Sequence, residues 1–348
     1  MKKIPSSPTL PPKGEGSNSP LSFWERVRVR VRPLLTYSLL AALLYFALRN
    51  APLTEIWGTL RNLQVWQILV LLGLNVIIYV LISLRWWLIV RAEKKDVSFL
   101  SLLAARVAVF GVSYFTLGPQ VGGEPLQVLH LQRNYGMTYT RATSTVVMDK
   151  LLEFLANFIL LGFGLTAIFQ SGIFSASGNT SLASLSGLVI LLLFPPVHIV
   201  LLYHGKYPVS AVLRKFSNNK FVRFVAASER MAGTFCRRHL GSLVSAIFVS
   251  LFAALGMVSE FFCITLFLGI DLSFWQTIAA WTAGWLAFLV PLPGGLGALE
   301  ASQVFALGAF GISAVSAIGV TLLIRARDLL IGGIGLLIAG QANRRSRL

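Results

Sequence analysis

Two pairs of oppositely charged residues lie inside apolar stretches of this 348-residue chain. Glu153 follows Lys150 by three residues, and Asp328 follows Arg325 by the same spacing. Residues three positions apart share one face of a helix, so each pair can neutralise its own charge. Ionised groups at membrane depth are costly and mark the paths of ions or substrates. We therefore expect these four residues to bind a polar substrate. The alternative is that each pair only balances its charge and fixes its helix against a neighbour.

Both pairs belong to a repeated unit. Residues 135–164 and 310–339 align without a gap, so that Gly136 matches Gly311 and the cation of each pair follows its glycine by 14 positions. Duplicated units with interrupted helices are typical of membrane transporters, whose binding sites lie between the units. The complete units extend over about 98–169 and 276–340.

Glycines next to prolines interrupt the apolar sequence upstream of each pair, at 118–125 and 291–297. Proline removes a backbone donor and glycine relaxes the helical dihedral angles, so half-helices should end at these breaks. The N–H groups of the next turn then favour an anion such as a lipid phosphate. The alternative is a plain proline kink. The glycines assigned to the site are Gly122, Gly123, Gly294 and Gly295.

Further charged residues stand close to the breaks. Glu124 and Glu300 follow them, and each could bind a cationic headgroup, exchange protons or cap a half-helix. Arg106, Arg133 and Arg141 lie on or beside the first unit and should form a basic approach at the cytosolic face that captures a lipid phosphate. The alternative for these three arginines is that they extend to the membrane interface.

The composition is that of an integral membrane protein. Of all residues, 55% are hydrophobic and 12% are charged, and the apolar runs can cross a hydrocarbon core of about 30 Å. A soluble helical protein would carry polar faces at the helical period, which these runs lack. The runs are 33–50, 65–84, 98–117, 146–169, 184–204, 241–270, 276–290 and 313–340, with a further stretch at 297–312.

The positive charge marks the cytosolic side and not a nucleic-acid surface. Of the 30 Lys and Arg residues, 22 lie before residue 33 or in 85–95, 206–238 and 344–347, which should face the cytosol. The positive-inside rule places loops rich in Lys and Arg in the cytosol. All four basic segments obey this rule if 98–132 forms a re-entrant hairpin that enters from the cytosolic side. A second re-entrant hairpin, 276–311, then enters from the opposite face. We therefore predict an all-α integral protein of the cell membrane. It has about six full transmembrane helices and two oppositely inserted re-entrant hairpins in an inverted repeat, with both termini in the cytosol.

Residues 1–32 differ from the membrane domain at 33–348. They are rich in Pro, Ser and Gly and end in alternating Arg and Val, which predicts a disordered basic tail that contacts anionic lipid. The alternative is that translation starts further along. We predict no cofactor and no metal site, since the four histidines are scattered and the two cysteines lie toward opposite sides of the membrane. A nucleotide-binding glycine loop is also missing from the sequence.

Four motifs carry a resemblance to a known family. They are Gly122-Gly123-Glu124-Pro125, Met148-Asp149-Lys150-Leu151-Leu152-Glu153, Pro291-Leu292-Pro293-Gly294-Gly295-Leu296-Gly297 with Glu300, and Leu323-Ile324-Arg325 with Asp328. With these motifs the chain resembles the membrane domain of the lysylphosphatidylglycerol synthase family, over about residues 33–342. The resemblance implies a flippase-like protein that moves a polar-headed lipid between leaflets, in the manner of stand-alone members without a synthase domain. Because the sequence shows no aminoacyl-transferase domain, it also implies a lipid transporter and not an enzyme.

We expect the protein to flip or scramble a phosphate-containing phospholipid or lipid-linked substrate, which passes from Lys150 to Arg325. Two other classes are left open. One is a secondary transporter of a soluble anion. The other is a membrane-bound transferase, or an accessory protein of envelope lipid or glycolipid synthesis that binds a partner lipid-synthesis enzyme. A central cavity that opens sideways to lipid would favour the lipid carrier.

Overall fold

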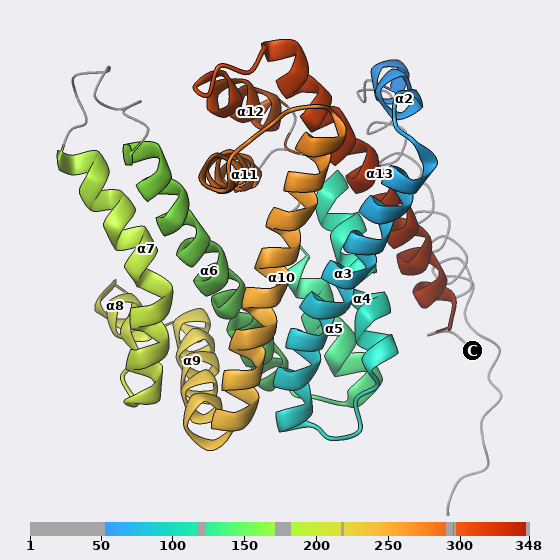
Figure 1. Cartoon of the computed structure of the whole chain (residues 1–348). Coiled ribbons are helices and arrows are strands. Elements are labelled where there is room, and N and C mark those ends of the chain that lie inside the picture. The colour runs from blue at the N-terminus through green and yellow to red at the C-terminus, as the bar shows by residue number, and fades with distance from the viewer. Residues whose placement is uncertain are drawn as a thin grey trace, which may run out of the picture.

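The computed structural model describes residues 53–116, 123–170, 182–216, 219–289, 295 and 297–345 (Figure 1). Within these ranges the regular structure is helical, without strands. The helices are α2 (Leu53–Arg61), α3 (Val65–Glu93), α4 (Phe99–Phe115), α5 (Glu124–Tyr135), α6 (Tyr139–Gln170), α7 (Leu182–Tyr203), α8 (Pro208–Phe216), α9 (Lys220–Arg238), α10 (Leu240–Phe267), α11 (Phe274–Phe288), α12 (Ala298–Gly308) and α13 (Ala314–Arg345).

Two helices of the described part, α3 and α10, are long and apolar enough to cross a membrane. They pack against each other. Only 11% of the most apolar stretch of α3 is buried, and the side chains of Leu69 and Val76 are each 63% exposed. A continuous apolar surface of this kind suits contact with lipid and not with water. The predicted helical membrane protein is therefore supported, while the number of full spans stays a prediction.

The two repeated units have the same order of helices. The short helices α4 and α5 precede the 32-residue helix α6, and α11 and α12 precede the 32-residue helix α13. Gly136 ends α5 with a φ of 65°, and its counterpart Gly311 has a φ of 81° after α12. Glycine adopts this left-handed conformation without strain, which explains its presence at both positions. In Figure 1, α6 rises from the lower end of the view and α13 descends from the upper end.

Each unit packs against the long helix of the other, since α4 lies along α13 and α11 lies along α6. A Cβ atom built on Gly335 would stand 2.2 Å from the Val107 carbonyl oxygen, and one on Gly111 would stand 2.6 Å from the Gly332 carbonyl oxygen. Small residues permit this close approach of helices inside a membrane. The interlocking holds α6 and α13, which carry the charged pairs, in a fixed relation.

The basic segment before α10 forms helices α8 and α9. Helix α9 packs against α6 and α7, and α8 packs on α9. Glu229 of α9 accepts hydrogen bonds from the backbone N–H groups of Val209 and Ser210, at 3.0 and 2.8 Å, and so satisfies the first turn of α8. The side chain of Asn219 accepts from the Val222 N–H at 2.9 Å and caps α9. The segment predicted to face the cytosol is thus helical, and its helix α9 packs against α6.

Helices end and begin on either side of each predicted break. The first break separates α4 from α5, and the second separates α11 from α12. The predicted tail at 1–32, the apolar run at 33–50, Gly122 and Gly294 lie outside the described residues. Insertion of the two short-helix pairs from opposite membrane faces stays a prediction.

Candidate functional site

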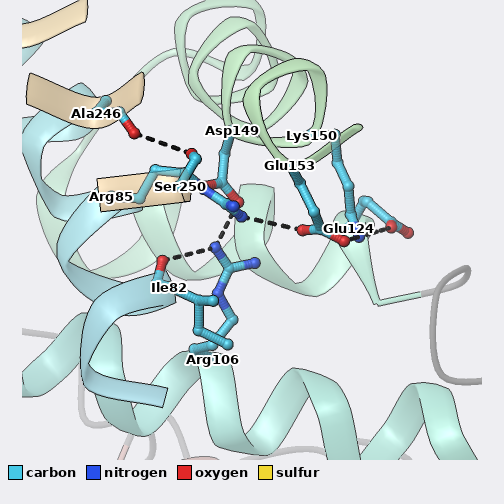
Figure 2. Close-up of polar contacts among 9 residues, drawn as sticks. All are labelled: Ile82, Arg85, Arg106, Glu124, Asp149, Lys150, Glu153, Ala246 and Ser250. Carbon is cyan, nitrogen blue, oxygen red and sulfur yellow. Dashed lines mark hydrogen bonds and ion pairs between the residues drawn. The ribbon is translucent and has the colours of Figure 1, made fainter. Parts of the chain in front are cut away.

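One group of charged side chains, the first cluster, joins α3, α4, α5 and α6. Its centre is Asp149, which is fully buried. The Arg85 Nε donates to Asp149 Oδ1 at 2.6 Å, and Arg106 pairs with the second oxygen of Asp149. Figure 2 shows both guanidinium groups reaching the carboxylate from neighbouring helices. The members of the first cluster are Arg85, Arg106, Glu124, Asp149, Lys150 and Glu153.

Lys150 lies at the edge of the first cluster. Its Nζ is 3.2 Å from Glu153 Oε1, so the predicted contact three residues along the helix is present. The same Nζ is 3.6 Å from Glu124 Oε1, which ties α5 to α6. The Lys150 and Glu124 side chains are 19% and 32% exposed, whereas Arg85 and Asp149 are almost completely buried. The outer pair can therefore meet a ligand, and the inner pair serves as a scaffold.

The second cluster joins α3, α10, α12 and α13. The Arg327 Nη1 lies 2.7 Å from Glu260 Oε2, and its Nη2 lies 2.8 Å from Asp328 Oδ1. The Asn75 amide donates to the other Glu260 oxygen at 2.8 Å. Both carboxylate oxygens of the buried Glu260 therefore have a partner. The members of the second cluster are Asn75, Glu260, Glu300, Arg325, Arg327 and Asp328.

Arg325 and Asp328 each have a partner outside the pair that the sequence predicted. The Arg325 Nε lies 2.5 Å from Glu300 Oε1, and Asp328 bonds to the adjacent Arg327. The other Glu300 oxygen accepts from the Gly297 N–H at 3.0 Å. Of the three roles left open for Glu300, helix capping is therefore present, together with an ion pair that fixes α12 to α13.

The remaining predicted residues surround the clusters. Gly123 precedes α5 at a tight contact, because a Cβ atom there would stand 2.3 Å from Ser113 Oγ. Gly295 is buried with a φ of 62°. Arg133 is exposed in the last turn of α5, and Arg141 is 48% exposed and pairs with Glu93 at 3.2 Å. Arg133 and Arg141 therefore stand at the surface. Arg106, which was expected to form a basic approach with them, is buried in the first cluster instead, because Asp149 binds its guanidinium group.

A cavity of about 200 Å³ lies between the two clusters. Its wall includes three cations and four carboxylates, and each of these cations is paired with a carboxylate. An incoming anion therefore competes with a carboxylate for each of these cations. The charged side chains that line the cavity are Arg106, Glu124, Lys150, Glu153, Glu260, Arg327 and Asp328.

A second hollow, the lateral groove, has a volume of about 520 Å³ and lies beside the cavity. Its walls are almost entirely apolar and come from α5, α6, α7 and α9. Val147 and Phe194 on these walls are 37% and 48% exposed, so the groove opens at an apolar surface. Among the described residues, Glu124 and Lys150 are the charged members of its wall, and both also line the central cavity. The ion pair between them is a boundary shared by the two spaces.

Reasoning from the sequence missed several polar residues of the site. Arg85 looked like one of the cations that mark the cytosolic side, and Asn75 has no charge to distinguish it within its apolar run. Gln127 and Gln303 line the cavity, each three residues after a predicted glutamate. The repeated Glu-x-x-Gln spacing at the start of α5 and α12 could have identified them.

Comparison with known proteins gives one finding. The family described as "Lysylphosphatidylglycerol synthase TM region" matches residues 33–335, which is most of the chain. No curated protein and no solved structure matches the chain.

Proposed function

The chain belongs to the family of lysylphosphatidylglycerol synthase transmembrane regions, and from this premise we propose that it flips or scrambles a phosphate-containing lipid across the cell membrane. One observation carries the proposal. The polar cavity and the apolar lateral groove meet at Glu124 and Lys150. An amphiphilic molecule matches this arrangement, with its hydrocarbon chain in the groove and its headgroup in the cavity.

The proposed path begins at the boundary. A lipid phosphate attracts Lys150 and displaces Glu124, whose contact of 3.6 Å is the longest ion pair in the first cluster. Charge-assisted hydrogen bonds to the phosphate offset part of the free energy that it loses when it leaves water. Glu153 stays beside Lys150 and balances its charge when the lipid leaves.

On the far side of the cavity, Arg327 is the receiving cation. Arg327 lines the cavity, whereas Arg325 forms the shortest ion pair of the second cluster with Glu300. We therefore propose Arg327, in place of the Arg325 expected from the sequence, as the residue that receives the phosphate. Arg325 positions α12, while Arg327 meets the headgroup and is balanced by Glu260 and Asp328.

A transporter of soluble anions is the second candidate, and it shares the buried charges. A soluble anion has no hydrocarbon chain to fill the apolar groove beside the charged cavity. The groove therefore favours a lipid as the substrate. We also propose a cell-membrane location with both termini in the cytosol, on the asymmetry of positive charge, and a role as a transporter and not as an enzyme. Its partners are the membrane lipid itself and a lipid-synthesis enzyme that supplies it.

The proposal is tested by measuring lipid flipping in proteoliposomes with phosphatidylglycerol labelled on one acyl chain. The native chain should raise the rate at which label leaves the inner leaflet above that of protein-free vesicles. Lys150→Ala and Arg327→Ala should each lower this rate about tenfold or more, because a hydrogen bond to a charged group is worth roughly 1.5–3 kcal/mol.

Lys215→Ala is the matched control, since Lys215 is an exposed cation on α8, and its rate should equal that of the native chain. Arg325→Ala should act through disordering of α12 and lower stability as well as rate. Unchanged flipping in a folded Lys150→Ala, Arg327→Ala double variant would rule out the proposed path.

A further inference from the structure

Each repeated unit carries one buried glutamine near the start of its second short helix. Gln127 follows Glu124 on α5, and Gln303 follows Glu300 on α12, both by three residues. Residues at this spacing share a helix face, so each short helix presents one carboxylate and one carboxamide to the same side. Gln127 is 1% exposed and Gln303 is 0% exposed, and both line the central cavity.

The hydrogen-bonding capacity of these glutamines is not used up by the described residues. Both polar atoms of the Gln127 side chain have no hydrogen-bond partner among those residues. The Gln303 Nε2 donates to the Ala280 carbonyl at 2.9 Å, but its Oε1 has no partner there. Buried polar groups are normally hydrogen-bonded, so unpartnered ones that line a cavity point to a ligand or to ordered water.

Two neighbouring residues extend the same pattern. Asn157 of α6 is 2% exposed, and its Oδ1 has no partner among the described residues. The Trp285 Nε1 of α11 likewise has no partner within the described part of the chain. Both residues line the cavity. Gly284 leaves room for the Gln303 side chain, because a Cβ atom at position 284 would stand only 2.7 Å from Gln303 Nε2.

The unused atoms determine which ligand chemistry fits. Gln127 Nε2 and Trp285 Nε1 donate, whereas the side-chain oxygens of Gln127, Gln303 and Asn157 accept. A phosphate only accepts hydrogen bonds and an ammonium only donates them, so neither satisfies this set alone. A hydroxyl group does both. The cavity volume of about 200 Å³ far exceeds the roughly 15 Å³ that one water requires on this scale.

We propose that Gln127, Gln303 and Asn157 form an uncharged subsite that binds the hydroxyl groups of a lipid headgroup, as in a glycerol or sugar headgroup. This inference rests on the proposed function, because it assumes that the headgroup enters the cavity. It assigns separate tasks to the two kinds of side chain: the charged clusters hold the phosphate, and the carboxamides select the alcohol that is esterified to it.

A pair of matched lipids tests the subsite. Dioctanoyl phosphatidylglycerol and dioctanoyl phosphatidylpropanol carry the same phosphate and the same chains, but only the first has free hydroxyl groups. Their affinities for the purified native chain are measured by calorimetric titration in detergent. The native chain should bind the glycerol lipid about tenfold more tightly, the change expected when one buried hydrogen bond of about 1–1.5 kcal/mol is lost.

Gln127→Leu and Gln303→Leu should bring the ratio of the two affinities close to one and leave binding of phosphatidylpropanol unchanged. Thermal stability separates this role from a structural one. Gln127→Leu removes a buried polar group that has no partner in the described part of the chain, so the variant should be as stable as the native chain or more stable. If Gln127→Leu fails to fold, Gln303→Leu and the two lipids on the native chain still decide the question.

Equal affinity of the native chain for the two lipids would overturn the subsite and indicate a cavity that holds only water. A lost preference accompanied by a matching loss of affinity for phosphatidylpropanol would also overturn it, since the glutamines would then act on packing alone. Preferential binding of phosphatidylglycerol without any flipping would contradict the proposed function and leave the subsite standing.

Discussion

Asp149→Asn should destabilise the protein more than the loss of any exposed charge. The Asp149 carboxylate is fully buried and neutralises two arginines, with Arg85 Nε at 2.6 Å. At an effective dielectric constant of about 20, the attraction at that distance is about 6 kcal/mol before desolvation is counted. Breaking a buried pair by removing one partner typically costs about 3–5 kcal/mol, because the remaining charge is left buried.

The arrangement of the cluster predicts a partial rescue. In Asp149→Asn the guanidinium groups of Arg85 and Arg106 are balanced locally by Glu153 alone, which lies 3.0 Å from Arg85. Adding Arg106→Met removes the surplus cation and keeps the pair of Arg85 with Glu153. The double variant should therefore be more stable than Asp149→Asn, although it contains one more substitution.

Equilibrium unfolding in mixed micelles, with rising mole fraction of a denaturing detergent, measures these differences. Asp271→Asn is the matched control, because Asp271 is exposed, and its free energy of unfolding should stay within about 0.5 kcal/mol of the native value. A loss below 1 kcal/mol for Asp149→Asn, or a double variant less stable than the single one, would refute the charge-balance reasoning.

Two further predictions concern helix packing and thiol chemistry. Gly335→Ala should cost about 1–3 kcal/mol or more, since its Cβ would stand 2.2 Å from the Val107 carbonyl oxygen. Gly333→Ala on the same helix meets no atom within 4 Å and should be near neutral in the same unfolding assay; equal effects would contradict the close packing. Burial raises the pKa of the Cys236 thiol to about 11, so the reactive thiolate is scarce below that pH. In a Cys263→Ser background, maleimide should label Cys236 slowly at pH 8 in the folded protein and rapidly after unfolding, and fast labelling of the folded protein would contradict its burial.

The sequence reveals charged residues where they interrupt an apolar run. Lys150 and Arg325 are visible for this reason, and the matching of Gly136 with Gly311 places them in equivalent helices. Arg85 cannot be recognised as a site residue from the sequence, because it begins the basic segment 85–95 and its charge is interpreted as marking the cytosolic side. Its role depends on how α3 packs against α6, which no local pattern contains.

Partner choice is the second feature that the sequence leaves undetermined. Spacing alone pairs Arg325 with Asp328, but α12 folds back along α13 and brings Glu300 to the guanidinium group. The boundary between Glu124 and Lys150 depends in the same way on the docking of α5 on α6. Such contacts between helices follow from packing of whole surfaces and not from periodicity.

The claim that a lipid enters through the lateral groove is tested most directly by obstructing that groove. Val147→Trp places a large side chain on its wall, while Val76→Trp places the same side chain on the exposed surface of α3. In the flipping assay with labelled phosphatidylglycerol, Val147→Trp should abolish most of the protein-dependent rate, and Val76→Trp should leave it unchanged. Equal rates for the two folded variants, or no flipping by the native chain, would contradict the account.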